Sequence, residues 1–186
     1  MIIFFIIFSL IIGWLRGGDI ERFSRMVISF PALIITSFFI QAALPWLTSS
    51  VFSPFSLFLL VFSYLLLTFA LIVNRKQLGF MVATVGILLN LLVITVNGGM
   101  PVSSAGFNES EVFHLESRID GVHTLLDGAT RLPWLADVIQ VPLPSPFGGL
   151  ASIGDVILGV GMFIIIQMNM VYIGKRRKKK VPVNES

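Results

Sequence analysis

The sequence has no cysteine and few charged residues. Without cysteine, a disulfide framework, a Cys-ligated metal site and a thiol nucleophile are all excluded. Charged residues make up 12% of the 186 residues, whereas hydrophobic residues make up 55%, and the mean hydropathy is +0.92. Such a chain has too little polar surface to cover a soluble globule. It is therefore predicted to be an integral membrane protein.

Common catalytic and metal-binding motifs are also missing. There is no phosphate-binding glycine loop with lysine, no Gly-x-Ser-x-Gly and no zinc-protease helix motif. His114 and His123 share a stretch with Glu111, Glu116 and Asp120, but a separation of nine residues would put the two imidazoles about 180° apart on a helix. No metal site and no cofactor are predicted.

Five hydrophobic stretches are predicted to cross the membrane, forming one all-α membrane domain over residues 1–186. The predicted spans are residues 2–15, 26–44, 51–73, 78–96 and 153–173. A spanning helix needs about 20 residues, which the last three stretches supply. The stretch 26–44 is slightly short, with Pro31 in its first turns and Pro45 ending it. The stretch 2–15 crosses only where the bilayer thins or Trp14 and Arg16 anchor it at the interface.

The basic residues predict the orientation of these spans. Eleven of the 13 Lys and Arg residues fall on one side of the membrane, which by the positive-inside rule is the cytoplasm. The amino terminus is then outside, and the tail 174–186 is cytoplasmic, with Lys175–Lys180 contacting anionic lipid headgroups. Because the basic residues are short clusters beside hydrophobic runs, no nucleic-acid partner is predicted.

The segment 97–152 is predicted to be an exterior, partly ordered segment on the membrane surface. It begins with the turn Asn97–Val102, where Gly98 and Gly99 permit positive φ angles and close backbone approach. The stretch His123–Pro144 is apolar and amphipathic, and is expected to lie in the interface with Trp134 as its anchor. The sequence Ser152–Asp155 matches a capping box that opens the last helix.

Polar residues within the spans gather toward their exterior ends. They are Gln41, Asn90, Thr95, Asn97 and Asp155. Since hydrocarbon makes such residues costly, they tend to face protein or water. A polar pocket that opens outward is one interpretation, and interhelical hydrogen bonds from Gln41 and Asn90 are the other. Small residues on the last two spans would allow close helix packing: Gly79, Ala83, Gly86, Gly154, Gly159 and Gly161.

The chain resembles a bacterial membrane-protein family catalogued as a domain of unknown function. The motifs that carry the resemblance are Gly13–Gly18, Asn97–Val102, His123 with Thr130–Leu132 and Ala136–Ile139, Pro142 and Pro144, and Ser152–Asp155. The resemblance covers nearly the whole chain and implies a five-span protein of the bacterial cytoplasmic membrane. It implies no particular activity.

A looser likeness links Arg131–Ile139 and Ala151–Asp155 to the catalytic end of lipoprotein signal peptidases. In that family one aspartate before the last helix and one at its start act at the exterior face, which implies catalytic roles for Asp137 and Asp155. The chain departs from the peptidases in two respects. In the peptidases another helix separates the aspartates from an Asn-x-Gly turn, which Asn97–Gly99 resembles. A basic residue near the second span of the peptidases has no clear counterpart here.

Two adjacent carboxylates would share a proton, because both cannot ionise cheaply. One of Asp137 and Asp155 would then activate water while the other protonated a carbonyl oxygen. Asn97 and the amides of Gly98 and Gly99 would be donors to the developing oxyanion. The competing interpretation of Asp155 is a helix cap favoured by the helix dipole.

Three functions remain open from the residues. The first is an accessory or binding protein whose outward polar site holds a lipid headgroup, a peptide or a partner helix without turnover. Its binding residues would be Asn90, Asn97, Gly98, Gly99, His123, Thr130 and Arg131, beside Asp137 and Asp155. The second is an aspartate-dyad hydrolase. The third is an oligomeric component of a small-solute transporter, for which Ser63, Tyr64 and Thr68 are the mid-span polar residues.

Overall fold

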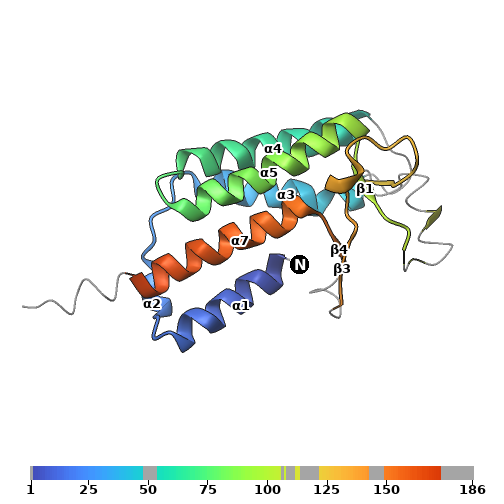
Figure 1. Ribbon diagram of the computed structural model, residues 1–186. Helices are drawn as coiled ribbons and strands as arrows, with labels where there is room; N and C mark the ends of the chain where they lie inside the picture. Colours follow the sequence, from blue (N-terminus) through green and yellow to red (C-terminus); the bar gives the residue numbers. More distant parts are fainter. Residues whose placement is uncertain are drawn as a thin grey trace, which may run out of the picture.

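The computed structural model describes residues 2–47, 54–105, 107, 112–113, 122–142 and 149–172. Its helices are α1 (Ile2–Leu15), α2 (Ile20–Ser24), α3 (Pro31–Leu47), α4 (Pro54–Val73), α5 (Leu78–Asn97) and α7 (Ile153–Gln167), which continues into the π-helical turn η2 (Met168–Tyr172). The long helices lie alongside one another as a bundle, with short strands at one end and α2 at the other (Figure 1). These ends are called the strand end and the α2 end.

Three helices are long and apolar enough to cross a membrane. They contain the stretches Phe55–Val73, Leu78–Asn97 and Ile153–Val171, with mean hydropathies of 2.6, 2.3 and 1.8. The predicted spans 51–73, 78–96 and 153–173 are thus confirmed as helices of spanning length over their described residues. The apolar helices α1 and α3 are shorter, with 14 and 17 residues.

Helix α3 does not have the predicted bounds of 26–44, since it begins at Pro31 and runs to Leu47 with Pro45 inside it. A residue that precedes proline is disfavoured in the α region, and Phe30 adopts a left-handed φ of 55°. The backbone of Ser29 is bonded instead to the turn after α4, where Asn74 Oδ1 accepts from its N–H and Asn74 Nδ2 donates to its carbonyl, both at 2.9 Å. These bonds hold the segment before Pro31 away from helical geometry.

The helices pack in the order α1, α7, α5, α4 and α3. The α5–α7 contact is the closest because glycines meet backbone atoms there. A Cβ on Gly161 would lie 2.5 Å from Ala83 N, and one on Gly79 would lie 2.7 Å from Gly161 O. A Cβ on Gly86 would lie 2.6 Å from Leu158 N. The predicted close packing of these small residues is confirmed.

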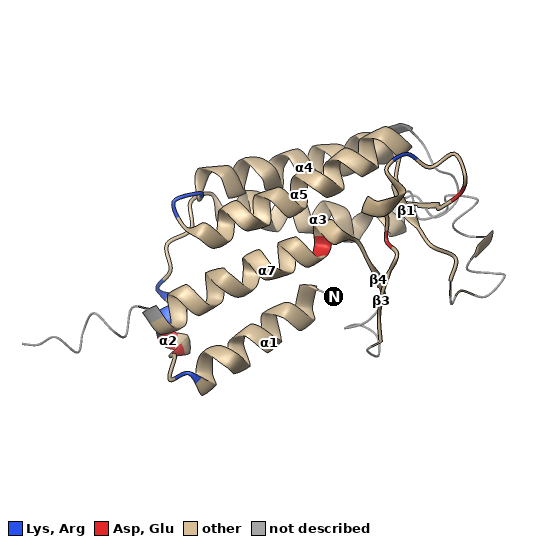
Figure 2. Cartoon of the chain, in the orientation of Figure 1, with Lys and Arg blue, Asp and Glu red and all other residues tan. Residues whose placement is uncertain are grey.

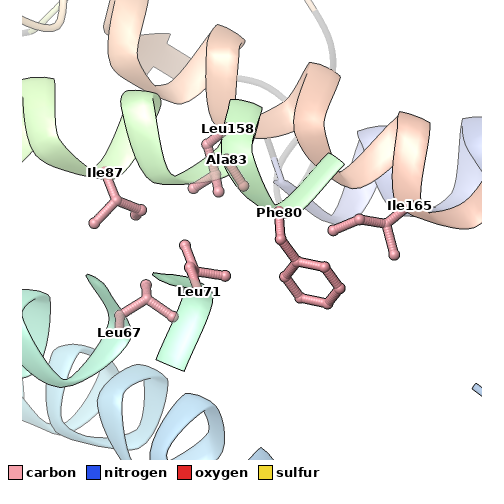
Figure 3. Close-up of a cluster of buried hydrophobic side chains, with 7 residues drawn as sticks. All are labelled: Leu67, Leu71, Phe80, Ala83, Ile87, Leu158 and Ile165. Atoms are coloured by element: carbon pink, nitrogen blue, oxygen red, sulfur yellow. The ribbon is translucent and has the colours of Figure 1, made fainter. Parts of the chain in front are cut away.

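Two clusters of buried apolar side chains hold the bundle together. One joins α4, α5 and α7 and consists of Leu67, Leu71, Phe80, Ala83, Ile87, Leu158 and Ile165 (Figure 3). The other consists of Leu44, Leu60, Val93, Ile94, Met100 and Leu135. Because Met100 and Leu135 belong to the segment between α5 and α7, the second cluster fastens that segment to the bundle.

The segment between α5 and α7 contains strands, so the all-α prediction needs correction there. Strand β1 (Met100–Val102) pairs in parallel with β2 (His123–Leu125), and β3 (Ile139–Val141) pairs antiparallel with β4 (Gly149–Ala151). The 3-10 turn η1 (Pro133–Leu135) lies between β2 and β3. The expected interfacial stretch 123–144 is therefore β-paired over part of its described length. Its apolar residue Leu135 packs into the bundle core and not on a membrane surface.

Charged side chains gather at the ends of the bundle, and the middle has none among the described residues (Figure 2). At the α2 end, blue marks both the α2 region and the turn between α4 and α5. Residues 48–53, the exterior residues His114, Glu111, Glu116 and Asp120, and the tail Lys175–Lys180 lie outside the described residues.

Candidate functional site

Asp137 is held at the strand end by backbone pairing with β1. Its N–H donates to Pro101 O at 2.8 Å, and its carbonyl accepts from Ser103 N at 3.1 Å, which makes a parallel bridge with Val102. The preceding residues Leu135 and Ala136 are fully buried, at 0% exposure. Asp137 therefore directly follows two apolar residues that are buried at the strand end of the bundle.

The β3–β4 hairpin brings Asp137 back to the start of α7. Ile139 pairs with Ala151 in antiparallel register. Asp137 comes two residues before Ile139, and Ile153, the first residue of α7, comes two residues after Ala151, so the same register places Asp137 opposite the start of α7. The electrostatic field of Asp155 reaches the Asp137 carboxyl. The two predicted aspartates are thus brought to the same end of the bundle.

Asp155 is engaged by the helix it opens and by α5. Its Oδ2 accepts from Ser152 N at 3.2 Å, and its own N–H donates to Ser152 Oγ at 2.9 Å. This reciprocal pair confirms the predicted capping box. Its Oδ1 accepts from Asn90 Nδ2 at 2.8 Å, while Asn90 Oδ1 accepts from Ser152 Oγ at 2.9 Å. Asn90 therefore bonds across helices, as one interpretation of the sequence predicted.

Asp137, in contrast, has an unsatisfied carboxyl oxygen. Its side chain is 8% exposed, and its buried Oδ1 has no hydrogen-bond partner. The pKa of Asp137 is raised to about 7, mainly by burial and also by the charge of Asp155, whereas His123 acts in the opposite direction. The carboxyl thus changes its charge near neutral pH, unlike an exposed aspartate.

No Lys or Arg forms an ion pair with either carboxyl in the part of the chain that the structure describes. The ion pairs found there lie in and beside α2, between Asp19 and Arg22 and between Glu21 and Arg25. The basic group that acts on Asp137 is the His123 imidazole, whose charge lowers the pKa of that carboxyl.

The turn after α5 does not offer free donors. Gly98 ends the helix with a left-handed φ of 71°, as the glycines predicted, and both the Gly98 and Gly99 amides donate to Ile94 O. Asn97 Nδ2 donates to Val93 O and Arg131 O, each at 2.9 Å, and Asn97 Oδ1 accepts from Arg131 N at 2.8 Å. The groups expected to hold an oxyanion are thus bonded to the protein itself.

Thr130 and Arg131 lie at a separate, shallow pocket of about 310 Å³. Its lining residues are Val96, Asn97, Thr124, Leu125, Asp127, Ala129, Thr130 and Arg131. Thr130 Oγ1 donates to Asp127 Oδ1 at 3.0 Å, which closes the loop that forms the wall. Of the predicted binding residues, Asn97, Thr130 and Arg131 are brought together here, whereas Asn90 lies with Asp155.

Tyr64 on α4, which the sequence predicted only as a mid-span polar residue of a transporter, belongs to this site. Its hydroxyl is hydrogen-bonded to the Asn90 side chain and lies in the field of both Asp137 and Asp155. The available signal was a phenol within a hydrophobic span. Gln41, expected to bond across helices, has a buried Nε2 with no partner.

Comparison with known proteins gives a family. A family model described as a family of unknown function, DUF5317, matches residues 25–167. The chain belongs to DUF5317. The chain is also 33% identical over 112 residues to an uncharacterized protein of Thermotoga maritima, covering 60% of this chain and 64% of that protein. It therefore spans less than two thirds of that relative's length. No solved structure matches the chain at a significant level.

The DUF5317 match confirms the predicted membership of a family of unknown function. It begins at residue 25, so α1 and the motif Gly13–Gly18 lie before it. The matched region of this DUF5317 chain includes Asn90, Asp137 and Asp155. Among its described residues, no three His, Asp or Glu side chains are grouped as metal ligands would be.

Proposed function

We propose that this chain is a five-span protein of a bacterial cytoplasmic membrane, with its amino terminus outside and its carboxyl terminus in the cytoplasm. Three helices have spanning length, and the shorter apolar helices α1 and α3 pack against α7 and α4 in the same bundle. Five basic residues lie in α2 or in the connections at that end: Arg16, Arg22, Arg25, Arg75 and Lys76. Together with Lys175–Lys180, which follow the last helix in the sequence, they support a cytoplasmic location for the α2 end.

We further propose that the strand end binds a ligand through a hydrogen-bond donor, without turnover. The observation that carries the proposal is the buried Oδ1 of Asp137, which lacks a partner. A buried acceptor without a donor costs about 1–3 kcal/mol, and a ligand that donates to it removes this cost. Because Asp155 adds a second carboxyl at the same end, with no ion pair among the described residues, a protonated amine suits the site best. Such an amine occurs on a lipid headgroup and at a peptide amino terminus.

Binding is favoured over hydrolysis by the state of the other groups. Both oxygens of Asp155 accept hydrogen bonds within the protein, and the Asn97 amide is bonded to the Arg131 backbone. A dyad mechanism needs a second carboxyl free to hold or release a proton on a water molecule. To gain that freedom, the Asp155 carboxylate would have to give up its hydrogen bonds with Ser152 N in the capping box and with Asn90 Nδ2.

The binding proposal is tested with two lipids that differ in their donors. The full chain is purified, incubated with phosphatidylethanolamine or phosphatidylcholine carrying the same acyl chains, and examined by native mass spectrometry. We expect preferential retention of phosphatidylethanolamine, whose ammonium donates, and loss of the preference in Asp137→Asn. The matched control is Asp127→Asn, which changes an exposed carboxylate in a loop.

A peptide source of the amine is tested in parallel with trialanine and N-acetyl-trialanine. Retention of only the free-amine peptide would assign the site to peptide amino termini instead of lipid headgroups. Equal retention of both lipids and both peptides by the wild-type chain would refute the amine site.

An aspartate-dyad hydrolase is the second candidate, favoured by the electrostatic coupling between Asp137 and Asp155. It predicts release of an amino-terminal membrane helix from a reporter lipoprotein precursor, and loss of that release in both Asp137→Asn and Asp155→Asn. If the reporter stays intact with the wild-type chain, the hydrolase is refuted and the binding proposal is unaffected.

A further inference from the structure

A second cavity, unrelated to the aspartates, lies inside the helix bundle. It has a volume of about 310 Å³, and every side chain that lines it is apolar. The lining comes from six helices and the segment after α2, and includes Ile6, Phe23, Ile34, Leu71, Phe80 and Met162. The Phe80 ring points between Leu71 of α4 and Ile165 of α7 (Figure 3). The cavity is thus continuous with the buried cluster of the bundle.

Helices α1 and α3 both line the cavity but pack on different neighbours, α1 on α7 and α3 on α4. Phe38 of α3 both lines the cavity and is 36% exposed. In a membrane, the exposed part of this side chain faces lipid hydrocarbon, so the cavity wall reaches the bilayer at Phe38.

The lining determines what can fill the space. A buried water needs two to four polar partners, and the cavity has no polar side chain. An apolar cavity of about 150 Å³ stays dry and takes up small apolar molecules, and this one is about twice that size. Since protein interiors are close-packed, an apolar space whose wall reaches the lipid at Phe38 is best filled by a hydrocarbon chain.

Basic residues stand at the α2 end of the same cavity. Leu71 near the end of α4 and Phe80 near the start of α5 line the cavity, and the turn that joins these two helices carries Arg75 and Lys76. The Ser29–Asn74 hydrogen bonds fasten the turn that carries Arg75 to the segment that contributes Met26 and Ile28 to the lining.

These basic residues are not neutralised within the described chain. Arg22 and Arg25 pair with Asp19 and Glu21, whereas Arg75 and Lys76 have no ion pair in the part of the chain that the structure describes. Two uncompensated positive charges beside an apolar cavity complement a molecule with an anionic head and a hydrocarbon tail.

We propose that this cavity binds one acyl chain of an anionic phospholipid from the leaflet at the α2 end, with the phosphate headgroup on Arg75 and Lys76. The site is distinct from the Asp137 site and does not depend on the function proposed for it. The bound lipid joins α1 and α3, which pack on different neighbours, into one unit.

Photo-crosslinking of the full chain in phosphatidylcholine vesicles tests the proposal. The probe is phosphatidylglycerol with a diazirine on its acyl chain, and the comparison probe is phosphatidylcholine with the same chain. We expect the phosphatidylglycerol probe to modify cavity-lining residues of α3 and α7. Excess unlabelled phosphatidylglycerol should compete, and excess phosphatidylcholine should not, a readout that needs no variant.

Matched variants on α7 separate the cavity from the outer surface. Met162→Trp fills the cavity and should abolish modification of its lining, whereas Val160→Trp changes a side chain that is 42% exposed and should leave it intact. Replacing Arg75 and Lys76 by alanine should lower the preference for phosphatidylglycerol by about fivefold for each charge removed.

Two results would overturn the proposal. One is modification spread over the exposed faces of all helices without saturation, which is the behaviour of lipid that merely surrounds the protein. The other is equal competition by the two unlabelled lipids, which would remove the role of the anionic headgroup.

Discussion

Asn90 on α5 donates from Nδ2 to Asp155 Oδ1 on the first turn of α7, at 2.8 Å. The side-chain oxygen of Asn90, Oδ1, accepts a hydrogen bond from Ser152 Oγ, and Ser152 caps α7. Asn90 thus stabilises the start of α7 from a neighbouring helix, in a place where few waters can substitute because Asn90 and Ser152 are buried. The capping box and the interhelical contact are one hydrogen-bond network.

Loss of this network should destabilise the bundle. We expect Asn90→Ala to lower the free energy of unfolding by about 1–3 kcal/mol, because buried partners on Ser152 and Asp155 are left unsatisfied. For a chain of this length that is about 2–4 °C in Tm per kcal/mol. Thermal unfolding in detergent measures it. The control is Thr95→Ala on the same helix, whose hydroxyl bonds only to its own helix at Leu91 O and Leu92 O. An equal loss in both variants would contradict the role assigned to Asn90.

The glycine contact between α5 and α7 predicts a steric effect. Gly161→Ala would place a Cβ 2.5 Å from Ala83 N and 2.8 Å from Ala83 Cα, so the backbones must separate. Overpacking of this kind costs about 1–3 kcal/mol. Gly128→Ala is the matched control, because nothing lies within 4 Å of its added Cβ. The same unfolding assay should show a lower Tm for Gly161→Ala alone, and an unchanged Tm would mean that the helices are not so close.

Stability should depend on pH through Asp137. Burial raises the pKa of this carboxyl from 3.8 to about 7, so the folded chain holds the proton more tightly than the unfolded chain. The resulting stability is complete below about pH 3.8 and is lost as the pH rises through about 7. Between pH 5 and pH 8 we expect the free energy of unfolding of the wild-type chain to fall by roughly the few kcal/mol that such a shift represents, and the Tm to fall with it.

The Asp137→Asn variant isolates this contribution, because an amide has the shape of the protonated acid and does not ionise. Its Tm should exceed that of the wild-type chain above about pH 7 and approach it at lower pH. Infrared spectroscopy should find the C=O band of a protonated carboxyl that disappears over the same range in the wild-type chain. If Asp137→Asn keeps the full pH dependence, another group is responsible.

Membrane orientation can be read with single cysteines, since the chain has none of its own. In intact cells, a maleimide that does not cross membranes should label Gly128→Cys and should not label Lys76→Cys. Opening the membrane should make both reactive. The reverse pattern would contradict the proposed orientation, and labelling of both in intact cells would contradict the span count.

Local patterns accounted for much of the fold. The apolar runs in α4 and α5, the glycine that ends α5 and the Ser152–Asp155 capping box are each determined within a few residues along the chain. The start of α3 was predicted five residues early because it depends on bonds between Ser29 and Asn74, which lie 45 residues apart. Contacts at that separation leave no periodic signal in the sequence.

The candidate site was predicted in its residue types and only partly in its roles. Asp137 and Asp155 do reach one end of the bundle, but the three-residue strands that bring them there are too short to be recognised from alternation. The roles of Asn97 and Arg131 depend on a bond between a side chain and a distant backbone, which side-chain chemistry alone does not predict. Tyr64 enters the site from α4 because of helix packing, which is again non-local.

The contact of backbone on backbone between α5 and α7 also limits how this molecule can move. Because the backbones are in contact at Gly86 and Gly161, little space is left between the two helices, and we expect α5 and α7 to move as one unit. A conformational change would then displace α1 or the α3–α4 pair relative to that unit. The strand end is packed on α5 through Met100 and would stay with it.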